Sequence, residues 1–216
     1  AALLDEETWS DSRFAYKAAL PGKGPLYDKL LEGKKKLAAS DFEGAERSFQ
    51  EAVELDHAEA EPYLFAGDLY ARESRFPEAV NRLQKALAAR GAPARAAFSL
   101  AEVYLRTYEP DLAEGVLAKL PPMDARANFY RGLAQAQRLH QPRAAEEKFQ
   151  KALSMGAHFP ELFFELGSLA AKGKNERLAE FYYAMALRYD PLHSKATLGL
   201  ALSRFRRWDV HRRQID

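Results

Sequence analysis

Small residues recur at a nearly constant spacing along the chain, and helical runs of apolar residues surround them. The first series is Gly33, Gly67, Ala101, Gly132, Gly167 and Ala201, with spacings of 34, 34, 31, 35 and 34 residues. A second series runs in step with it: Ala45, Ala79, Ala113, Ala145 and Ala179, with spacings of 34, 34, 32 and 34. Short polar breaks such as AASDF and AKGKNE divide each period into two apolar stretches. The pattern predicts pairs of antiparallel helices of about 12 to 14 residues, which must stack on one another to bury their apolar faces.

The residues at fixed places in the period resemble the tetratricopeptide repeat family. The second unit has Tyr63, Gly67 and Tyr70 at the family's spacing, and the fifth has Phe163 and Gly167. The resemblance implies an all-α fold, a right-handed α-solenoid of helix-turn-helix repeats. It covers five repeats, at residues 26–59, 60–93, 94–124, 125–159 and 160–193. We expect an N-terminal capping helix and Pro/Gly linker at 1–25, and a C-terminal capping helix with a basic tail at 194–216.

Gly and Ala are expected where two helix backbones approach closely. These structural repeat positions are Gly33, Ala45, Gly67, Ala79, Gly132, Ala145, Gly167 and Ala179. The third unit departs from the pattern, because its second helix contains Gly115 and is followed by Pro121 and Pro122. We therefore expect an irregular turn within residues 110–124 in place of a second helix of full length.

Composition removes several classes of chemistry. The chain has no cysteine, and its net charge is only +1. None of the five histidines has the spacing of a helical metal site, and neither a phosphate-binding loop nor a nucleophile elbow is present. We expect no enzyme, no catalytic residue, no metal and no cofactor. No apolar run approaches the roughly 18 residues of a membrane span, which favours a soluble protein, cytoplasmic or periplasmic.

The resemblance implies that the first helix of each repeat lines a concave groove that binds a protein or peptide. The expected groove residues are Leu31, Lys34, Leu64, Phe65, Arg72, Arg95, Phe98, Phe129, Tyr130 and Phe164. We expect their aromatic rings to form a partly exposed ladder. The alternative is that Leu64, Phe98, Phe129 and Phe164 simply pack between adjacent first helices.

The leading hypothesis is a non-catalytic scaffold or adaptor that binds a protein segment, apolar or amphipathic, for assembly of a larger complex such as a bacterial pilus, secretion system, organelle or envelope. Lys34, Arg72, Arg95, Arg106 and Arg126 would orient acidic residues of that segment. Only Lys34 and Arg95 match the subgroup that clamps acidic chaperone tails, so such tails are not expected to bind.

Two alternatives remain. The basic segment 191–216, of net charge +4, could bind nucleic acid or an acidic partner, although nucleic acid is not the expected partner. The terminal helices could also join copies of the chain into a self-assembling homo-oligomer.

Overall fold

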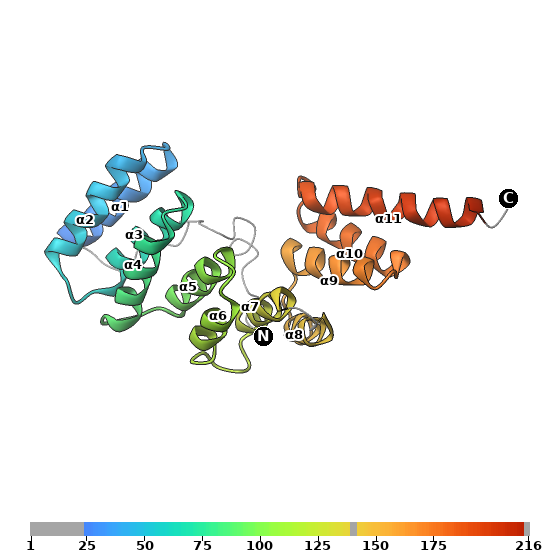
Figure 1. The fold of residues 1–216 in the computed structure, drawn as a ribbon. Helices are drawn as coiled ribbons and strands as arrows, with labels where there is room; N and C mark the ends of the chain where they lie inside the picture. The colour runs from blue at the N-terminus through green and yellow to red at the C-terminus, as the bar shows by residue number, and fades with distance from the viewer. Residues whose placement is uncertain (1–23, 139–141, 214–216) are drawn as a thin grey trace. The chain divides into compact units, whose positions relative to one another are not determined.

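The fold is all-α in the residues that the computed structural model describes, 24–138 and 142–213 (Figure 1). The capping helix expected in the N-terminal segment lies outside the described residues 24–138. The helices run as α1 Pro25–Ala38, α2 Phe42–Leu55, α3 Ala60–Arg72, α4 Phe76–Ala88, α5 Ala94–Arg106, α6 Pro110–Leu117, α7 Ala125–Gln137, α8 Pro142–Ser154, α9 Pro160–Lys172, α10 Glu176–Tyr189 and α11 Ser194–Arg213.

Consecutive helices pair as hairpins, α1 with α2 through α9 with α10, and α11 packs on α10. The small residues lie where the two helices of a hairpin meet. A Cβ atom added to Gly33 would lie 2.4 Å from the Phe49 ring, and one added to Gly132 would lie 2.4 Å from Phe149. Only glycine lets these backbones approach so closely, which accounts for its place in the period.

The turn inside each hairpin has the same backbone conformation wherever the structure describes it. In each of these turns, a single residue that follows the first helix of the hairpin adopts a positive φ near 60°, in the left-handed region. These residues are Ser40, Ser74, Tyr108 and Lys174. The next backbone N–H reaches back to the helix, as in Asp41 N to Lys36 O at 2.8 Å and Arg75 N to Tyr70 O at 2.9 Å. This bond pattern is the Schellman motif, which satisfies the last carbonyls of the first helix.

The irregular third repeat, residues 94–124, has a short second helix, as its sequence predicts. Helix α6 has 8 residues, against 13 or 14 in the other second helices. It ends at Leu117, four residues before Pro121, and tight turns follow, with Leu120 N donating to Leu117 O at 3.0 Å. Since a residue that precedes proline disfavours the helical conformation, no helix of full length crosses residues 110–124.

The described helices form two compact units that divide at Pro121–Pro122. Helices α1–α6 make up one unit and helices α7–α11 make up the other. In the first unit the rings of Phe49 and Phe65 stack with centroids 5.7 Å apart. In the second, the Phe129 ring lies edge-on to Phe159 at 4.8 Å. Each unit therefore has its own aromatic core.

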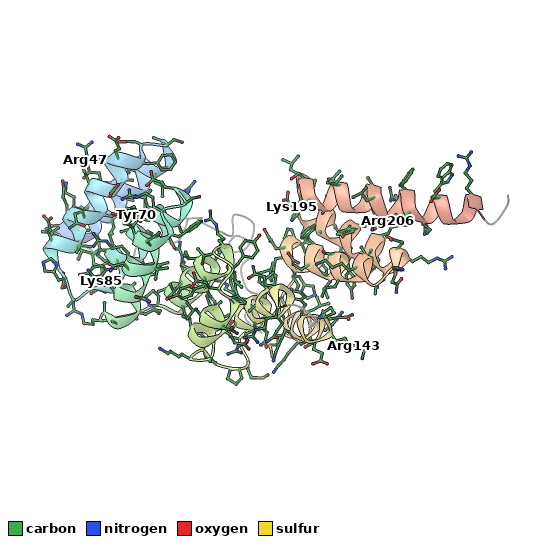
Figure 2. All side chains as sticks on the ribbon, in the orientation of Figure 1. Arg47, Tyr70, Lys85, Arg143, Lys195 and Arg206 are labelled. Atoms are coloured by element: carbon green, nitrogen blue, oxygen red, sulfur yellow. The ribbon has the colours of Figure 1, made fainter. Side chains whose placement is uncertain are left out.

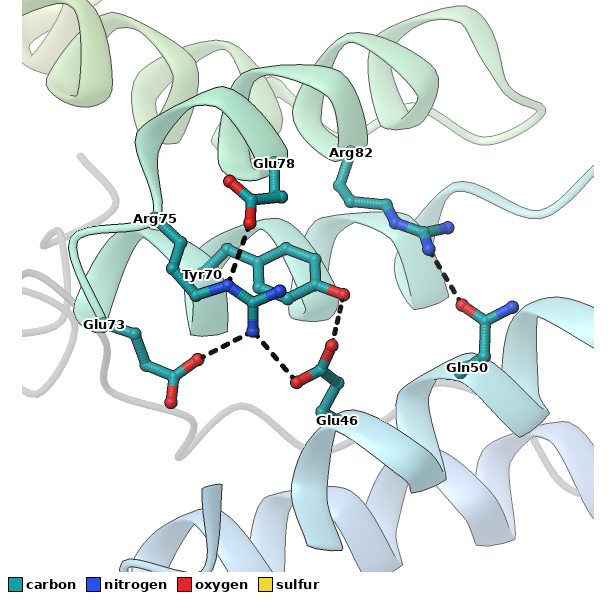
Figure 3. Close-up of polar contacts among 7 residues, drawn as sticks. All are labelled: Glu46, Gln50, Tyr70, Glu73, Arg75, Glu78 and Arg82. Carbon is teal, nitrogen blue, oxygen red and sulfur yellow. Dashed lines mark hydrogen bonds and ion pairs between the residues drawn. The ribbon is translucent and has the colours of Figure 1, made fainter. Parts of the chain in front are cut away.

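Polar contacts join the first two hairpins on the side of their second helices (Figure 3). The carboxylate of Glu46 on α2 accepts from the Tyr70 hydroxyl at 2.7 Å and from Arg75 Nη1 at 3.1 Å. The Arg75 guanidinium also lies 4.3 Å from the Tyr70 ring centroid. Arg82 of α4 donates to Gln50 of α2 at 2.9 Å. These contacts fix α2 against the second hairpin, although each one, being partly exposed, adds little stability by itself.

Candidate functional site

Most of the aromatic ladder expected in the groove is buried. Leu64, Phe65 and Phe98 are buried, and Phe129 is only 6% exposed. The expectation that these side chains form a partly exposed stripe is therefore wrong, because all four are buried. Phe129 shows the reason, since its ring contacts Phe149 and Phe159 in the core of its own unit.

The remaining predicted groove residues are more accessible, but they belong to two different units. In the first unit, Leu31 and Arg72 are exposed, and Lys34 and Arg95 are half-buried. Tyr130 and Phe164 are half-buried members of the second unit. The Phe164 ring packs on the His193 ring, with ring centroids 5.3 Å apart. Within one unit, the structure therefore brings only part of the predicted set together.

Three of the expected groove residues, Lys34, Phe65 and Arg95, converge around α3. Together with Glu61 and Asp68 they form what we call the α3 polar cluster. Lys34 of α1 and Arg95 of α5 each lie 5.9 Å from the centre of the Phe65 ring. Arg95 Nη2 also donates to Asp68 Oδ2 at 2.7 Å. Three successive first helices thus contribute to one cluster.

Two carboxylates in this cluster are incompletely satisfied. Asp68 Oδ1 and Glu61 Oε2 are both buried, and among the described residues neither has a hydrogen-bond partner. Burial raises the pKa of Asp68 above its ordinary range, and the charge of Arg95 and a hydrogen bond from the Ser99 side chain only partly oppose this effect. Burial likewise raises the pKa of Glu61, and the nearby Glu59 adds to the shift. A buried carboxylate oxygen without a donor costs free energy, so these positions favour an approaching N–H group.

The two cations of the cluster repel each other. Burial lowers the pKa of Lys34, and the positive charge of Arg95 lowers it further. A carboxylate placed near both groups would offset their repulsion, because opposite charges favour the ionised forms. The cluster can therefore interact with donors and with acceptors of a polar ligand.

The repeat register places Asp68 on the groove-facing side of its first helix, although Asp68 was not among the binding residues expected there. Helix α3 is buried along almost its whole length, from Pro62 to Ala71. A charged residue inside so apolar a helix is uncommon unless it is paired. That pattern could have identified Asp68 from the sequence.

Arg106, expected to orient a ligand, instead joins two hairpins. Its Nη1 donates to the carbonyl of Ala71 at 2.7 Å, at the C-terminal end of α3. Its guanidinium also lies 4.8 Å from the Phe76 ring centroid. Arg106 thus satisfies an end carbonyl of α3 and favourably places a cation at the negative end of that helix.

Within residues 24–138 and 142–213, no group of three or more His, Cys, Asp or Glu side chains could hold a metal ion. None of the helices in these ranges is long and apolar enough to span a bilayer.

The tetratricopeptide repeat model matches the sequence twice, over residues 30–80 and 64–121. Among curated proteins, no sequence matches the chain. Solved structures are similar in fold. One is a tetratricopeptide repeat protein of Thermus thermophilus, with a TM-score of 0.70 and 19% identity over 84% of this chain and 100% of that one.

Two further structures show the same likeness. YrrB, described as a tetratricopeptide repeat protein with an unusual peptide-binding site, has a TM-score of 0.56 and 23% identity over 80% of this chain and 90% of its own. PilF of Pseudomonas aeruginosa has a TM-score of 0.68 and 21% identity over 81% and 80%. Sequence identities this low show that the folds are similar and nothing more. The sequence match shows tetratricopeptide repeats over residues 30–121, and the described helical hairpins share the fold of tetratricopeptide repeat proteins.

Proposed function

We propose that the chain is a non-catalytic scaffold whose first unit binds a segment of another protein at the α3 polar cluster. The observation that carries this proposal is the pair of buried, unpartnered carboxylate oxygens, Asp68 Oδ1 and Glu61 Oε2, beside the cations Lys34 and Arg95. Proteins with this fold generally bind other proteins, and YrrB is described as having a peptide-binding site.

The chemistry of the cluster selects a polar segment rather than an apolar one. Backbone or side-chain N–H groups of the segment would donate to Asp68 and Glu61. An acidic side chain or a carbonyl of the segment would accept from Lys34 and Arg95. Three of the rings expected to anchor an apolar ligand, Phe65, Phe98 and Phe129, are already buried, so they offer little new area for burial. Recognition through hydrogen bonds and charge then supplies the specificity for assembly of a larger complex.

A displayed library of random peptides of about 12 residues tests this proposal, because it presents polar, charged and apolar segments to the chain at the same time. Peptides selected on the full chain should lose about tenfold or more in affinity for Lys34→Gln and for Asp68→Asn, as expected when a charged hydrogen-bonding partner is removed. Phe181→Ser, an exposed position of the other unit, is the matched control and should bind the peptides unchanged.

Circular dichroism and thermal melting would verify that each variant remains folded. Selected peptides that bind Lys34→Gln and Asp68→Asn as well as they bind the parent chain would contradict the placement of the site. A library that yields no binder at all would contradict the function.

A further inference from the structure

Helix α11 has two apolar sides, and only one of them is covered. The covered side packs on α10. There Ala196 is buried, and a Cβ atom added to Gly199 would lie 2.6 Å from the Tyr183 ring. Figure 1 shows α11 lying along α10, with its last turns running beyond α10. A helix that is apolar on two opposite sides normally has a neighbour on each.

The uncovered side carries four large apolar residues, which we call the outer stripe: Leu198, Leu202, Phe205 and Trp208. Their spacings of four, three and three residues place them on one face of the helix. Leu198, Phe205 and Trp208 are 61%, 62% and 55% exposed. A single exposed apolar residue is ordinary, but a contiguous series of this kind marks an interaction surface.

The repeat register indicates what kind of element covers such a stripe. Leu198 follows Phe164 by 34 residues, and Leu30 and Leu64 hold the same place in the first and second repeats. Those two residues are buried, and both belong to first helices that another hairpin follows. In the described residues no helix follows α11. The surface is therefore shaped to receive a further helix.

The charge of α11 decides between candidate helices. Residues 194–213 contain six basic residues and one acidic residue. Arg206, labelled on α11 in Figure 2, pairs with Glu176 at 3.5 Å, and Arg207 pairs with Glu180 at 3.1 Å. Arg212 instead lies over the Trp208 ring, 5.4 Å from its centre, at the outer stripe itself. A second α11 brought against this face would meet like charge, whereas an acidic helix would meet opposite charge.

We propose that the outer stripe of α11 is a docking site for an amphipathic helix of a partner protein, with Asp or Glu residues beside its apolar face. Apolar residues of the partner cover Phe205 and Trp208, and its carboxylates approach Arg212 beside the Trp208 ring. This site is separate from the α3 polar cluster, and it does not depend on the function proposed for that cluster.

Two synthetic helical peptides of about 18 residues provide the test. Both carry leucines at the same amphipathic positions, and the remaining positions are mainly Glu in one and mainly Lys in the other. Fluorescence anisotropy with the full chain should show the Glu peptide binding at least about tenfold more tightly than the Lys peptide. Its affinity should fall when salt is raised from about 0.05 M to about 0.5 M, because the paired charges are partly exposed.

Phe205→Ser combined with Trp208→Ser should abolish binding of the Glu peptide. Both residues are exposed, so the fold does not depend on them. Phe181→Ser is the matched control, since Phe181 is 57% exposed on α10 of the same unit.

Three outcomes would overturn the proposal. The first is equal binding of the Glu and Lys peptides, or of the Glu peptide to the double variant. The second is a concentration-dependent dimer in light scattering that the double variant does not form, which would make a second copy the occupant. The third is sedimentation with phosphatidylglycerol vesicles without binding of the Glu peptide, which would make the stripe a membrane surface.

Discussion

Asp68 is held in an environment that opposes its charge. It is fully buried on α3, with one oxygen paired to Arg95 and the other without a hydrogen-bond partner among the described residues. Burial is the largest influence on its pKa, and it outweighs the attraction of Arg95. Such a pair adds little net stability, since the loss of hydration offsets the Coulomb attraction. The residue is better explained by binding than by stabilisation of the fold.

The raised pKa of Asp68 predicts a pH dependence of stability. A pKa that is higher in the folded chain than in the unfolded chain means that the folded state binds the proton more tightly. The stability it contributes is present below the unfolded value and is lost as pH rises through the folded value. The free energy of unfolding of the parent chain should therefore fall relative to that of Asp68→Asn as pH is raised from about 4 toward neutral.

Urea unfolding of both proteins across this range would measure the difference. If attraction to Arg95 dominated instead, the parent chain would gain stability relative to Asp68→Asn as pH rises, and the interpretation of Asp68 would be wrong.

At the scale of the helices, close approach within a hairpin depends on residues without a side chain. Gly33 on α1 faces the ring of Phe49 on α2, which is completely buried and cannot move aside. Gly115 on α6 faces open space, since a Cβ atom there would have nothing within 4 Å. Both glycines are helical and both belong to the first unit.

These two glycines predict opposite effects of the same substitution. Gly33→Ala should destabilise the first unit by about 1 to 3 kcal/mol, because the added methyl group overpacks the hairpin. Gly115→Ala should stabilise it by about 0.5 to 1 kcal/mol, because alanine favours the helical backbone. Denaturant unfolding followed by circular dichroism would measure both, and destabilisation by Gly115→Ala would mean that Gly115 also lies at a close helix contact.

At the scale of the whole molecule, half of the basic residues of the C-terminal segment pair with carboxylates of α10. Arg204 and Arg207 approach Glu180 at 3.9 and 3.1 Å, and Arg206 approaches Glu176 at 3.5 Å. These contacts belong to the packing of α11 on α10. Half of the basic residues in this segment are therefore paired locally, which weakens the nucleic-acid alternative.

The pairing of these arginines predicts weak binding to nucleic acid, which a titration with single-stranded RNA at two salt concentrations would measure. The parent chain should show little binding and a shallow dependence on salt, because the paired arginines of α11 displace few counterions from phosphate. A Glu176→Gln and Glu180→Gln double variant should bind more tightly and with a steeper dependence. Tight, steeply salt-dependent binding by the parent chain would restore nucleic acid as a partner.

The sequence by itself determined the repeat, because the spacing of small and apolar residues is a local property of a chain that must bury one face of each helix. The short α6 could be predicted for the same reason, since Gly115, Pro121 and Pro122 act on the backbone near them. The left-handed turns at Ser40, Ser74, Tyr108 and Lys174 were not predicted, because none of these residues is the glycine that usually marks that conformation.

Only the tertiary structure decided which large side chains are exposed. Phe129 on α7 and Phe205 on α11 are both phenylalanines in helices, yet one is 6% exposed and the other 62%. Local sequence cannot distinguish them, because exposure depends on which other helices pack against each ring. The α3 polar cluster likewise required three helices to bring Lys34, Asp68 and Arg95 together. Periodicity therefore predicted the helices, and packing between them decided where a partner can bind.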